Sequence, residues 1–218
     1  MLARLTLAAA TASMLPTTAA AEPTLEPLRP CYDSVSPDPG GTEAVELVGS
    51  GFTPGALVDI FRDEEILYPR VPVDAAGALP AGSLPAPYVA RGRRSFTVTV
   101  TEQGNPAQTV TAESLVTALD VEVTPRRATP ATRVRFEGAG FTAPRPVYLH
   151  YVRAGRARET VRIVRRASGP CGEFDVRRRQ FPFLPAVGRW QLQFDQRKRW
   201  RREPAGAFLR MRIDVQRG

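Results

Sequence analysis

"VELVGSGFTPGALVDI", residues 45–60, returns as "VRFEGAGFTAPRPVYL", residues 134–149. The matched positions are 89 residues apart throughout, and they include both glycines and the Phe-Thr pair that follows them. Later landmarks recur with small insertions: "DAAGAL" (74–79) matches "GPCGEF" (169–174), "SFTVTVTEQ" (95–103) matches "RWQLQFDQ" (189–196), and "NPA" (105–107) matches "EPA" (203–205). Self-similarity at a fixed period indicates one structural unit used twice.

The glycines of this repeat raise a choice between a ligand-binding loop and a turn. A phosphate-binding loop would need a helix N-terminus directly after Gly49 and Gly51, whereas the residues that follow them alternate as a strand does. We therefore expect both glycines to end a strand and to permit positive φ where the chain crosses between sheets. Phe52 is expected to enter the core.

The remaining sequence predicts an all-β protein. Its 21 prolines and 17 glycines leave few windows for a long helix. Short runs such as "RSFTVTV" and "MRIDV" alternate with period two, as half-buried strands do. Turn signals at a spacing of about 8–12 residues favour a sandwich over a barrel or a propeller. The sequence thus predicts two tandem immunoglobulin-like β-sandwich domains, residues 22–119 and 120–218, each with roughly seven strands.

The first residues follow the order of a secretory signal peptide. Arg4 precedes an apolar run from Leu5 to Leu15, and Ala19 and Ala21 stand at the small positions that a signal peptidase requires. We expect residues 1–21 to be cleaved and the product to be secreted or held at the cell surface. No later apolar run approaches the roughly 20 residues of a membrane-spanning helix, so no membrane insertion is expected.

The pattern "GSGFTPG" (49–55), with a "DAAG" turn (74–77) and a closing strand "FTVTV" (96–100), resembles the tandem immunoglobulin-like repeats of exported bacterial proteins, notably from high-GC actinobacteria. One lysine, Lys198, among 30 Lys and Arg residues fits such a genome. The resemblance covers essentially the whole mature chain. It implies the fold, in modules that serve as spacers, adhesins and wall-associated proteins, and it carries over no catalytic or binding residue.

Cys31 and Cys171 are expected to form a disulfide, because an exported protein folds in an oxidising compartment. The bond would join residues 140 positions apart. In a straight tandem, however, the start of the first unit and a mid-sandwich turn of the second would lie farther apart than the ~7 Å that the two Cα atoms allow. Either the units fold side by side, with the N-terminal segment reaching across, or both thiols stay free.

No group of residues assembles a catalytic or metal site, so the sequence predicts no enzyme, no cofactor and no metal. The single histidine, His150, matches Phe61 and is expected to be an outward-facing or half-buried strand residue. Without a second histidine a zinc site lacks ligands, and a Ser-His-Asp relay lacks a serine on a sharp elbow. The acidic run "DEE" (63–65) lacks the further carboxylates of a calcium loop and predicts a solvated hairpin tip.

The strongest functional signal is the division of charge. Residues 22–120 contain six Arg and Lys against fourteen Asp and Glu, a net charge of −8, whereas residues 121–218 contain twenty-three against eight, a net charge of +15. A genome-wide bias toward arginine would have affected both units alike. The candidate polyanion-binding residues lie in "RKRWRR" and "RRR" and are Arg197, Lys198, Arg199, Trp200, Arg201, Arg202, Arg177, Arg178 and Arg179.

The "RKRWRR" run is expected to be a loop, because the first unit has only "GNP" (104–106) between the equivalent strands. The second unit has lengthened this turn and filled it with like charges, which repel one another. The arginines could bind phosphates or carboxylates bidentately, and Trp200 could offer a stacking or cation–π face. In the alternative, Trp200 folds back onto the sandwich and the arginines pair with "DEE" as an interdomain clamp.

The sequence therefore predicts an exported, non-enzymatic structural or adhesion-type protein whose basic second domain binds an anionic envelope polymer or an acidic protein. A nucleic-acid-binding protein is the alternative, since extracellular DNA is also a polyanion. An accessory carbohydrate-binding module is the third. For stacking on a sugar only Trp200 is a candidate, because Trp190 matches the core position of Phe96.

Overall fold

The computed structural model describes residues 22–216, so the predicted signal peptide at 1–21 lies outside the described residues. The described part of the chain consists of strands, turns and irregular segments and contains no helix. The strands are β1 (Thr24–Leu25), β2 (Cys31–Ser34), β3 (Ala44–Leu47), β4 (Gly49–Ser50), β5 (Leu57–Arg62), β6 (Glu65–Pro72), β7 (Gly82–Pro85), β8 (Arg93–Glu102), β9 (Asn105–Ala118), β10 (Asp120–Thr124), β11 (Arg133–Ala139), β12 (Val147–Arg153), β13 (Arg156–Val164), β14 (Phe174–Arg179), β15 (Gly188–Asp195) and β16 (Phe208–Val215).

Strands β1 to β9 form the first sandwich. Its larger sheet has the order β2-β9-β8-β5-β6, and the short pairs β3-β7 and β1-β4 stand opposite it. Val45 on β3 and Leu84 on β7 pack in one cluster with Val98 on β8, which closes the two layers over a core. All strand pairs are antiparallel except β2 with β9, which run parallel with Cys31 opposite Leu115.

Strands β10 to β16 form the second sandwich. One sheet has the order β10-β11-β14 and the other the order β13-β12-β15-β16, and every neighbouring pair is antiparallel. In immunoglobulin lettering β10, β11 and β14 are strands A, B and E, and β12, β15 and β16 are strands C, F and G. The predicted fold class, all-β with tandem immunoglobulin-like sandwiches, is confirmed by this pairing.

The strand register reproduces the sequence repeat. Phe61 on β5 is opposite Thr99 on β8, and its match, His150 on β12, is opposite Gln193 on β15. The separation of Thr99 and Gln193 is the one that the sequence match of residues 95–103 to 189–196 requires. The repeat is therefore structural as well as sequential.

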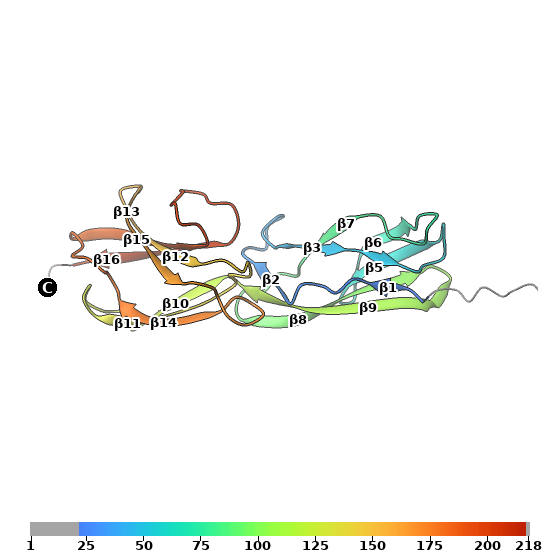
Figure 1. The fold of residues 1–218 in the computed structure, drawn as a ribbon, viewed down its shortest axis with the longest axis horizontal. Coiled ribbons are helices and arrows are strands. Elements are labelled where there is room, and N and C mark those ends of the chain that lie inside the picture. The colour runs from blue at the N-terminus through green and yellow to red at the C-terminus, as the bar shows by residue number, and fades with distance from the viewer. Residues whose placement is uncertain (1–21, 217–218) are drawn as a thin grey trace, which may run out of the picture.

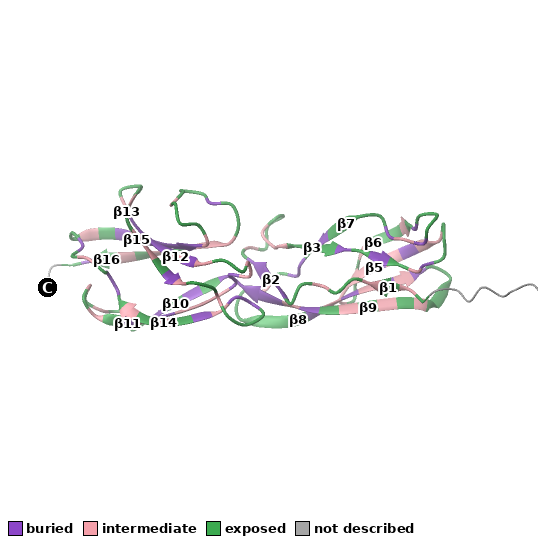
Figure 2. Ribbon diagram, viewed as in Figure 1, coloured by how far each residue is buried: buried purple, intermediate pink, exposed green. Residues whose placement is uncertain are grey.

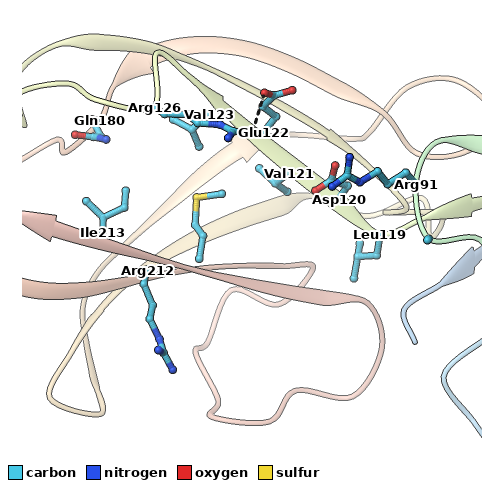
Figure 3. Close-up of a pocket in the computed structure, with 12 residues that line it drawn as sticks. Arg91, Leu119, Asp120, Val121, Glu122, Val123, Arg126, Gln180, Arg212 and Ile213 are labelled. Atoms are coloured by element: carbon cyan, nitrogen blue, oxygen red, sulfur yellow. Dashed lines mark ion pairs between the residues drawn. The ribbon is translucent and has the colours of Figure 1, made fainter. Parts of the chain in front are cut away.

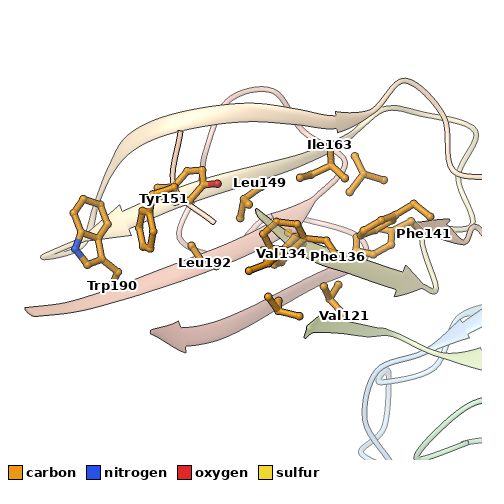
Figure 4. Packing of buried hydrophobic residues seen from close by; sticks show 14 of the residues in the cluster. Val121, Val134, Phe136, Phe141, Leu149, Tyr151, Ile163, Trp190 and Leu192 are labelled. Carbon is orange, nitrogen blue, oxygen red and sulfur yellow. The ribbon is translucent and has the colours of Figure 1, made fainter. Parts of the chain in front are cut away.

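The buried apolar side chains form two separate clusters, one within residues 32–116 and one within residues 119–215. Figure 2 shows the buried positions alternating along the strands of both sandwiches. Phe52 and Phe141, which are 3% and 0% exposed, enter the two clusters as predicted. Figure 4 shows Phe141 and Trp190 at the two ends of the second core. The boundary after residue 119 stays a prediction.

The two glycines of the repeat have different tasks. Gly51 and its match Gly140 have φ values of 85° and 91°, which glycine adopts without strain. The same expectation for Gly49 is wrong, because this residue pairs with β1 in a strand. A Cβ atom at Gly49 would lie 2.8 Å from side-chain carbons of Leu25 and Leu79, so these leucines would have to shift to admit a larger residue. Neither Gly49 nor Gly51 is followed by a helix, so the helix N-terminus that a phosphate-binding loop requires is absent here.

The two sandwiches lie end to end (Figure 1). Strand β9 leaves the first sandwich and continues, after Leu119, as β10 of the second. The backbone N–H of Leu119 donates to the carbonyl oxygen of Ser34, 3.1 Å away. Leu119 is the only residue between β9 and β10, and its own hydrogen bond fixes it to β2. This short connection keeps β9 of the first sandwich in line with β10 of the second.

Candidate polyanion-binding surface

The basic loop, residues 197–202, lies between β15 and β16, where the sequence predicted it. Its five cations are all exposed: Arg197, Lys198, Arg199, Arg201 and Arg202. Within residues 22–216, no carboxylate lies within ion-pair distance of any of them. The loop therefore concentrates positive charge that no carboxylate of residues 22–216 neutralises in an ion pair.

Gln193 anchors the basic loop to the sheet beneath it. This residue lies on the outer face of β15, yet it is 0% exposed because the loop covers it. Its amide nitrogen donates to the carbonyl oxygen of Arg201, 3.0 Å away. Its amide oxygen accepts from Nε1 of Trp200 and from Nε of Arg210, each at 3.2 Å. One buried side chain thus holds the backbone of the loop and its tryptophan.

Asp195 fixes the start of the loop. Its Oδ1 accepts the backbone N–H of Arg197 at 2.8 Å and lies 3.2 Å from Nε2 of His150, and its Oδ2 accepts the amide of Gln193 at 2.8 Å. Burial opposes ionisation of this carboxyl. The hydrogen bonds from His150, Gln193 and the Arg197 amide outweigh burial and hold the pKa of Asp195 below its ordinary value.

His150 extends this network to the neighbouring strand. Its Nδ1 lies 2.9 Å from the hydroxyl oxygen of Thr160 on β13. The imidazole points to the outer face of the sheet, which agrees with the predicted outward-facing position. The predicted half-buried position is wrong, because His150 is 0% exposed. The reason is that the loop between β15 and β16 folds back over this face of the sheet.

The hydroxyl of Thr160, the imidazole of His150 and the carboxylate of Asp195 are arranged in the same order as the groups of a Ser-His-Asp triad. His150 and Asp195 are 0% and 1% exposed, however, and none of the cavities in this region is lined by them or by Thr160. In this closed arrangement the network braces the basic loop. Sequence reasoning missed Thr160, Gln193 and Asp195, because outward positions of alternating strands predict solvent exposure.

Trp200 folds back onto the second sandwich, as in the alternative set out for this loop. The interdomain clamp that accompanied this alternative is not formed. Asp63 pairs with Arg94 at 3.0 Å and Glu65 pairs with Arg62 at 2.6 Å, so both carboxylates find partners within the first sandwich. The "DEE" run lies at the turn of the β5–β6 hairpin, as predicted.

The three arginines of "RRR" lie on β14, in the sheet opposite the one that carries the basic loop. Arg177 and Arg179 are exposed on the outer face, where Arg179 stands directly opposite Arg133 on β11. Arg178 instead donates to the carbonyl oxygen of Arg162 on β13, 3.0 Å away. The two predicted groups of cations therefore do not form one surface.

Cys31 and Cys171 form a disulfide, with the Cα atoms 5.0 Å apart. The predicted disulfide is therefore confirmed, and the free-thiol alternative is wrong. The side-by-side arrangement that was to explain the bond is also wrong, because the sandwiches lie end to end and the bond lies at their junction (Figure 1). The physical reason is the place of β2. It pairs in parallel with Leu115–Ala118, the last residues of β9, and therefore lies at the end of the first sandwich that faces the second. A disulfide is typical of proteins of oxidising compartments.

The junction also buries acidic groups of the first sandwich. A cavity of about 310 Å³, lined by residues of both sandwiches, contains Asp33 and Glu43. Glu43 pairs with Arg29 at 2.8 Å, accepts the backbone N–H of Asp33 at 2.9 Å and accepts the hydroxyl of Thr142 at 3.4 Å. The carboxyl of Asp33 has no hydrogen-bond partner among the described residues. Burial, and then the neighbouring Glu43, raise the pKa of Asp33 to about 7.

Residues 22–216 contain no group of three or more His, Cys, Asp or Glu side chains placed to hold a metal ion. Among the same residues no helix has the length and apolar character needed to cross a membrane.

No protein-family model matches the chain, and no curated protein matches it. Among solved structures it is similar to the human OSCAR ligand-binding domain, with 15% identity over 89% of this chain and 97% of that chain and a TM-score of 0.35. It is also similar to a tetra-tandem repeat in the extending region of a large adhesion protein, with 16% identity, coverage of 85% and 49% and a TM-score of 0.30. A third is the Bacteroides ovatus mixed-linkage glucan utilization locus SGBP-B in complex with a mixed-linkage heptasaccharide, with 14% identity, coverage of 89% and 47% and a TM-score of 0.25. At these TM-scores the fold assignment rests on the strand pairing described above.

Proposed function

We propose that this chain is an exported, non-enzymatic protein whose basic loop, residues 197–202, binds an anionic polymer of the cell envelope or an acidic protein. The observation that carries the proposal is the contrast between the loop's backbone and its side chains. Asp195 and Gln193 hold the backbone from beneath, while the cations remain exposed and without carboxylate partners.

A loop fixed in this way loses little conformational entropy when it binds a ligand. Four of its cations, Lys198, Arg199, Arg201 and Arg202, make no side-chain hydrogen bond within the described structure, so their donors are free for phosphates or carboxylates. The fifth, Arg197, donates from Nε to the carbonyl oxygen of Ala205 at 3.2 Å and helps to hold the loop.

The disulfide between Cys31 and Cys171 supports an exported location, because such bonds persist in oxidising compartments. The anchoring of Trp200 disfavours the carbohydrate-module alternative. Stacking on a sugar needs a freely presented aromatic face, and this indole is half-buried and hydrogen-bonded to Gln193.

The test replaces the four cations with free side chains by serine and measures retention on an anionic column together with the melting temperature. We expect retention to be lost and the melting temperature to change little, because Arg197 and the buried network stay intact. A lower melting temperature with unchanged retention would show that the loop is structural and overturn the proposal.

A matched variant removes the same charge from the opposite side of the sandwich. It replaces Arg133, Arg177 and Arg179 on the other sheet and Arg127 in the β10–β11 connection with serine. These four side chains are exposed. If this variant loses as much retention as the loop variant, net charge rather than the loop is responsible, and the proposal fails. Competition between duplex DNA and an acidic glycan then separates nucleic acid from an envelope polymer, which salt dependence alone does not.

A further inference from the structure

Strand β16 is an edge strand, whereas its equivalent in the first sandwich is not. Both β9 and β16 pair antiparallel with the preceding strand of their sheet, β8 or β15. In the first sandwich β2 adds to the outer side of β9 and completes the order β2-β9-β8-β5-β6. In the second sandwich the order β13-β12-β15-β16 ends at β16 without such a strand.

The segment that covers β9 also closes the core of the first sandwich. Leu28 and Tyr32 pack against the first cluster, and Tyr32 meets Phe96 edge-on with the ring centroids 5.9 Å apart. The hydroxyl of Ser114 on β9 donates to the carbonyl oxygen of Arg29. The N-terminal segment is thus fastened to β9 by main-chain pairing and by inserted apolar side chains.

The equivalent place in the second sandwich is a groove. Ser114 is opposite Phe96, and Ile213 is opposite Trp190, the match of Phe96. Ile213 therefore occupies the position of Ser114. Ser114 is covered by the N-terminal segment, whereas Ile213 lines a cavity of about 660 Å³ between β16 and β10 (Figure 3). The apolar lining residues are Ala90, Leu119, Val121, Val123, Met211 and Ile213.

The groove is open because the chain after β10 does not cross to the sheet that contains β16. Strand β10 pairs with β11 along all of Asp120–Thr124, and Pro125 follows directly. In the described structure, the backbone hydrogen bonds made outside the sheets do not involve any residue of β16. An edge strand with free N–H and C=O groups is a template for pairing with another chain.

We propose that an extended segment of a partner protein binds in this groove as a strand parallel to β16, as β2 does beside β9. Main-chain hydrogen bonds to β16 would supply affinity, and an apolar or aromatic side chain would enter between Val121 and Ile213 as Tyr32 enters the first core. This mode of recognition is strand addition at a sheet edge.

The charges of the groove indicate what kind of segment it takes. Its lining contains two carboxylates, Asp120 and Glu122, and three guanidiniums, Arg91, Arg126 and Arg212, and Arg126 pairs with Glu122 at 3.7 Å. The groove therefore has only one more positive than negative group, although residues 121–218 carry a net charge of +15. An apolar, nearly neutral segment fits it, in contrast to the polyanion proposed for the basic loop.

The test uses a synthetic peptide with the sequence of residues 26–35 and Cys31→Ser, because this segment covers the equivalent edge in the first sandwich. Hydrogen exchange of the native chain is followed with and without the peptide. We expect slower exchange in β16 and no change in β13, the other edge of the same sheet. A control peptide with Leu28→Ser and Tyr32→Ser should not protect β16.

Two variants of the chain sharpen the test. Ile213→Glu, which places a carboxylate in the groove, should weaken peptide binding at least about tenfold, while Asp214→Lys should leave it unchanged, because Asp214 is exposed on the same strand and does not line the groove. If Ile213→Glu does not fold, the comparison of the two peptides with the native chain decides. The quadruple loop variant should bind the peptide normally, which separates this proposal from the function proposed above.

Absence of protection in β16 at about 1 mM peptide, or equal protection by the control peptide, would overturn the proposal. Protection at residues 197–202 alone would also overturn it, because binding would then be electrostatic. If β16 becomes protected in the chain by itself as protein concentration rises, the occupant is a second copy and the assignment to a partner protein is wrong.

Discussion

Nε2 of His150 lies 3.2 Å from Oδ1 of Asp195 on the outer face of a sheet, and neither residue is more than 1% exposed. Both are buried because the loop between β15 and β16 lies over them. A buried polar group that loses its partner costs about 1–3 kcal/mol. The conformation of the basic loop is therefore coupled to the stability of the sheet through this pair.

We expect Asp195→Asn to destabilise the protein by about 3 kcal/mol at neutral pH. The amide oxygen can still accept the N–H of Arg197, but the amide nitrogen then faces the donor nitrogen of Gln193, and a charged acceptor is lost. The midpoint of urea unfolding measures this loss. Asp214→Asn is the control: its carboxylate is exposed and pairs with Arg189 at 3.5 Å, and such pairs contribute under about 1 kcal/mol.

The destabilisation caused by Asp195→Asn should depend on pH. Because the pKa of Asp195 is lowered in the folded state, its contribution is fully present above its unfolded pKa of about 4 and is lost as pH falls through the lower folded value. The difference between wild type and Asp195→Asn should therefore shrink in strong acid. A difference that stays constant with pH would contradict the assigned ionisation.

Reducing the disulfide should destabilise the chain without unfolding either core, because the two clusters are separate. The bond joins residues 140 apart, and a closed loop of this length is worth about 4–5 kcal/mol of unfolded-state entropy. Urea unfolding of Cys31→Ser/Cys171→Ser measures the effect. In the native chain both thiols should resist alkylation until a reductant is added, and rapid labelling without reductant would contradict the bond.

Asp33→Asn should stabilise the protein in weak alkali. Since burial raises the pKa of Asp33 to about 7, its favourable contribution is present below the unfolded pKa of about 4 and is lost as pH rises through about 7. The variant should gain about 2 kcal/mol over wild type at about pH 8 and much less at about pH 5. Asp38→Asn, an exposed carboxyl in the same segment, should show no such dependence.

Gly77→Ala should cost more than Gly104→Ala, although both glycines have a φ of 77°. The backbone conformation alone costs an alanine about 1–2 kcal/mol. At Gly77 the added Cβ would also lie 2.5 Å from the carbonyl oxygen of Phe52, whereas at Gly104 nothing lies within 4 Å. Thermal unfolding of the two variants isolates the steric part, and equal losses would show that the backbone relaxes to remove the contact.

The sequence by itself determined the local structure and the repeat. Alternation with period two, frequent prolines and glycines, and the 89-residue repetition predict strands and sandwiches from short-range properties. The core position of Trp190 follows from the same alternation, because a side chain's face is fixed once its strand is placed. Phe52 and Phe141 lie outside the strands, and their core positions were predicted from the repeated motif. The exposure of the five cations of "RKRWRR" follows from the insertion of this run between two strands.

Tertiary structure decided what depends on pairing between distant residues. Strand β2 joins β9 more than 80 positions later, and only this pairing brings Cys31 to the junction. His150 became buried because a loop some 50 residues further on folds over its face, and no local pattern encodes such a cover. The groove beside β16 exists because the chain after Thr124 does not cross between sheets as the segment before Cys31 does. Each outcome rests on long-range contacts, whose energies depend on where other segments lie rather than on neighbouring residues in the sequence.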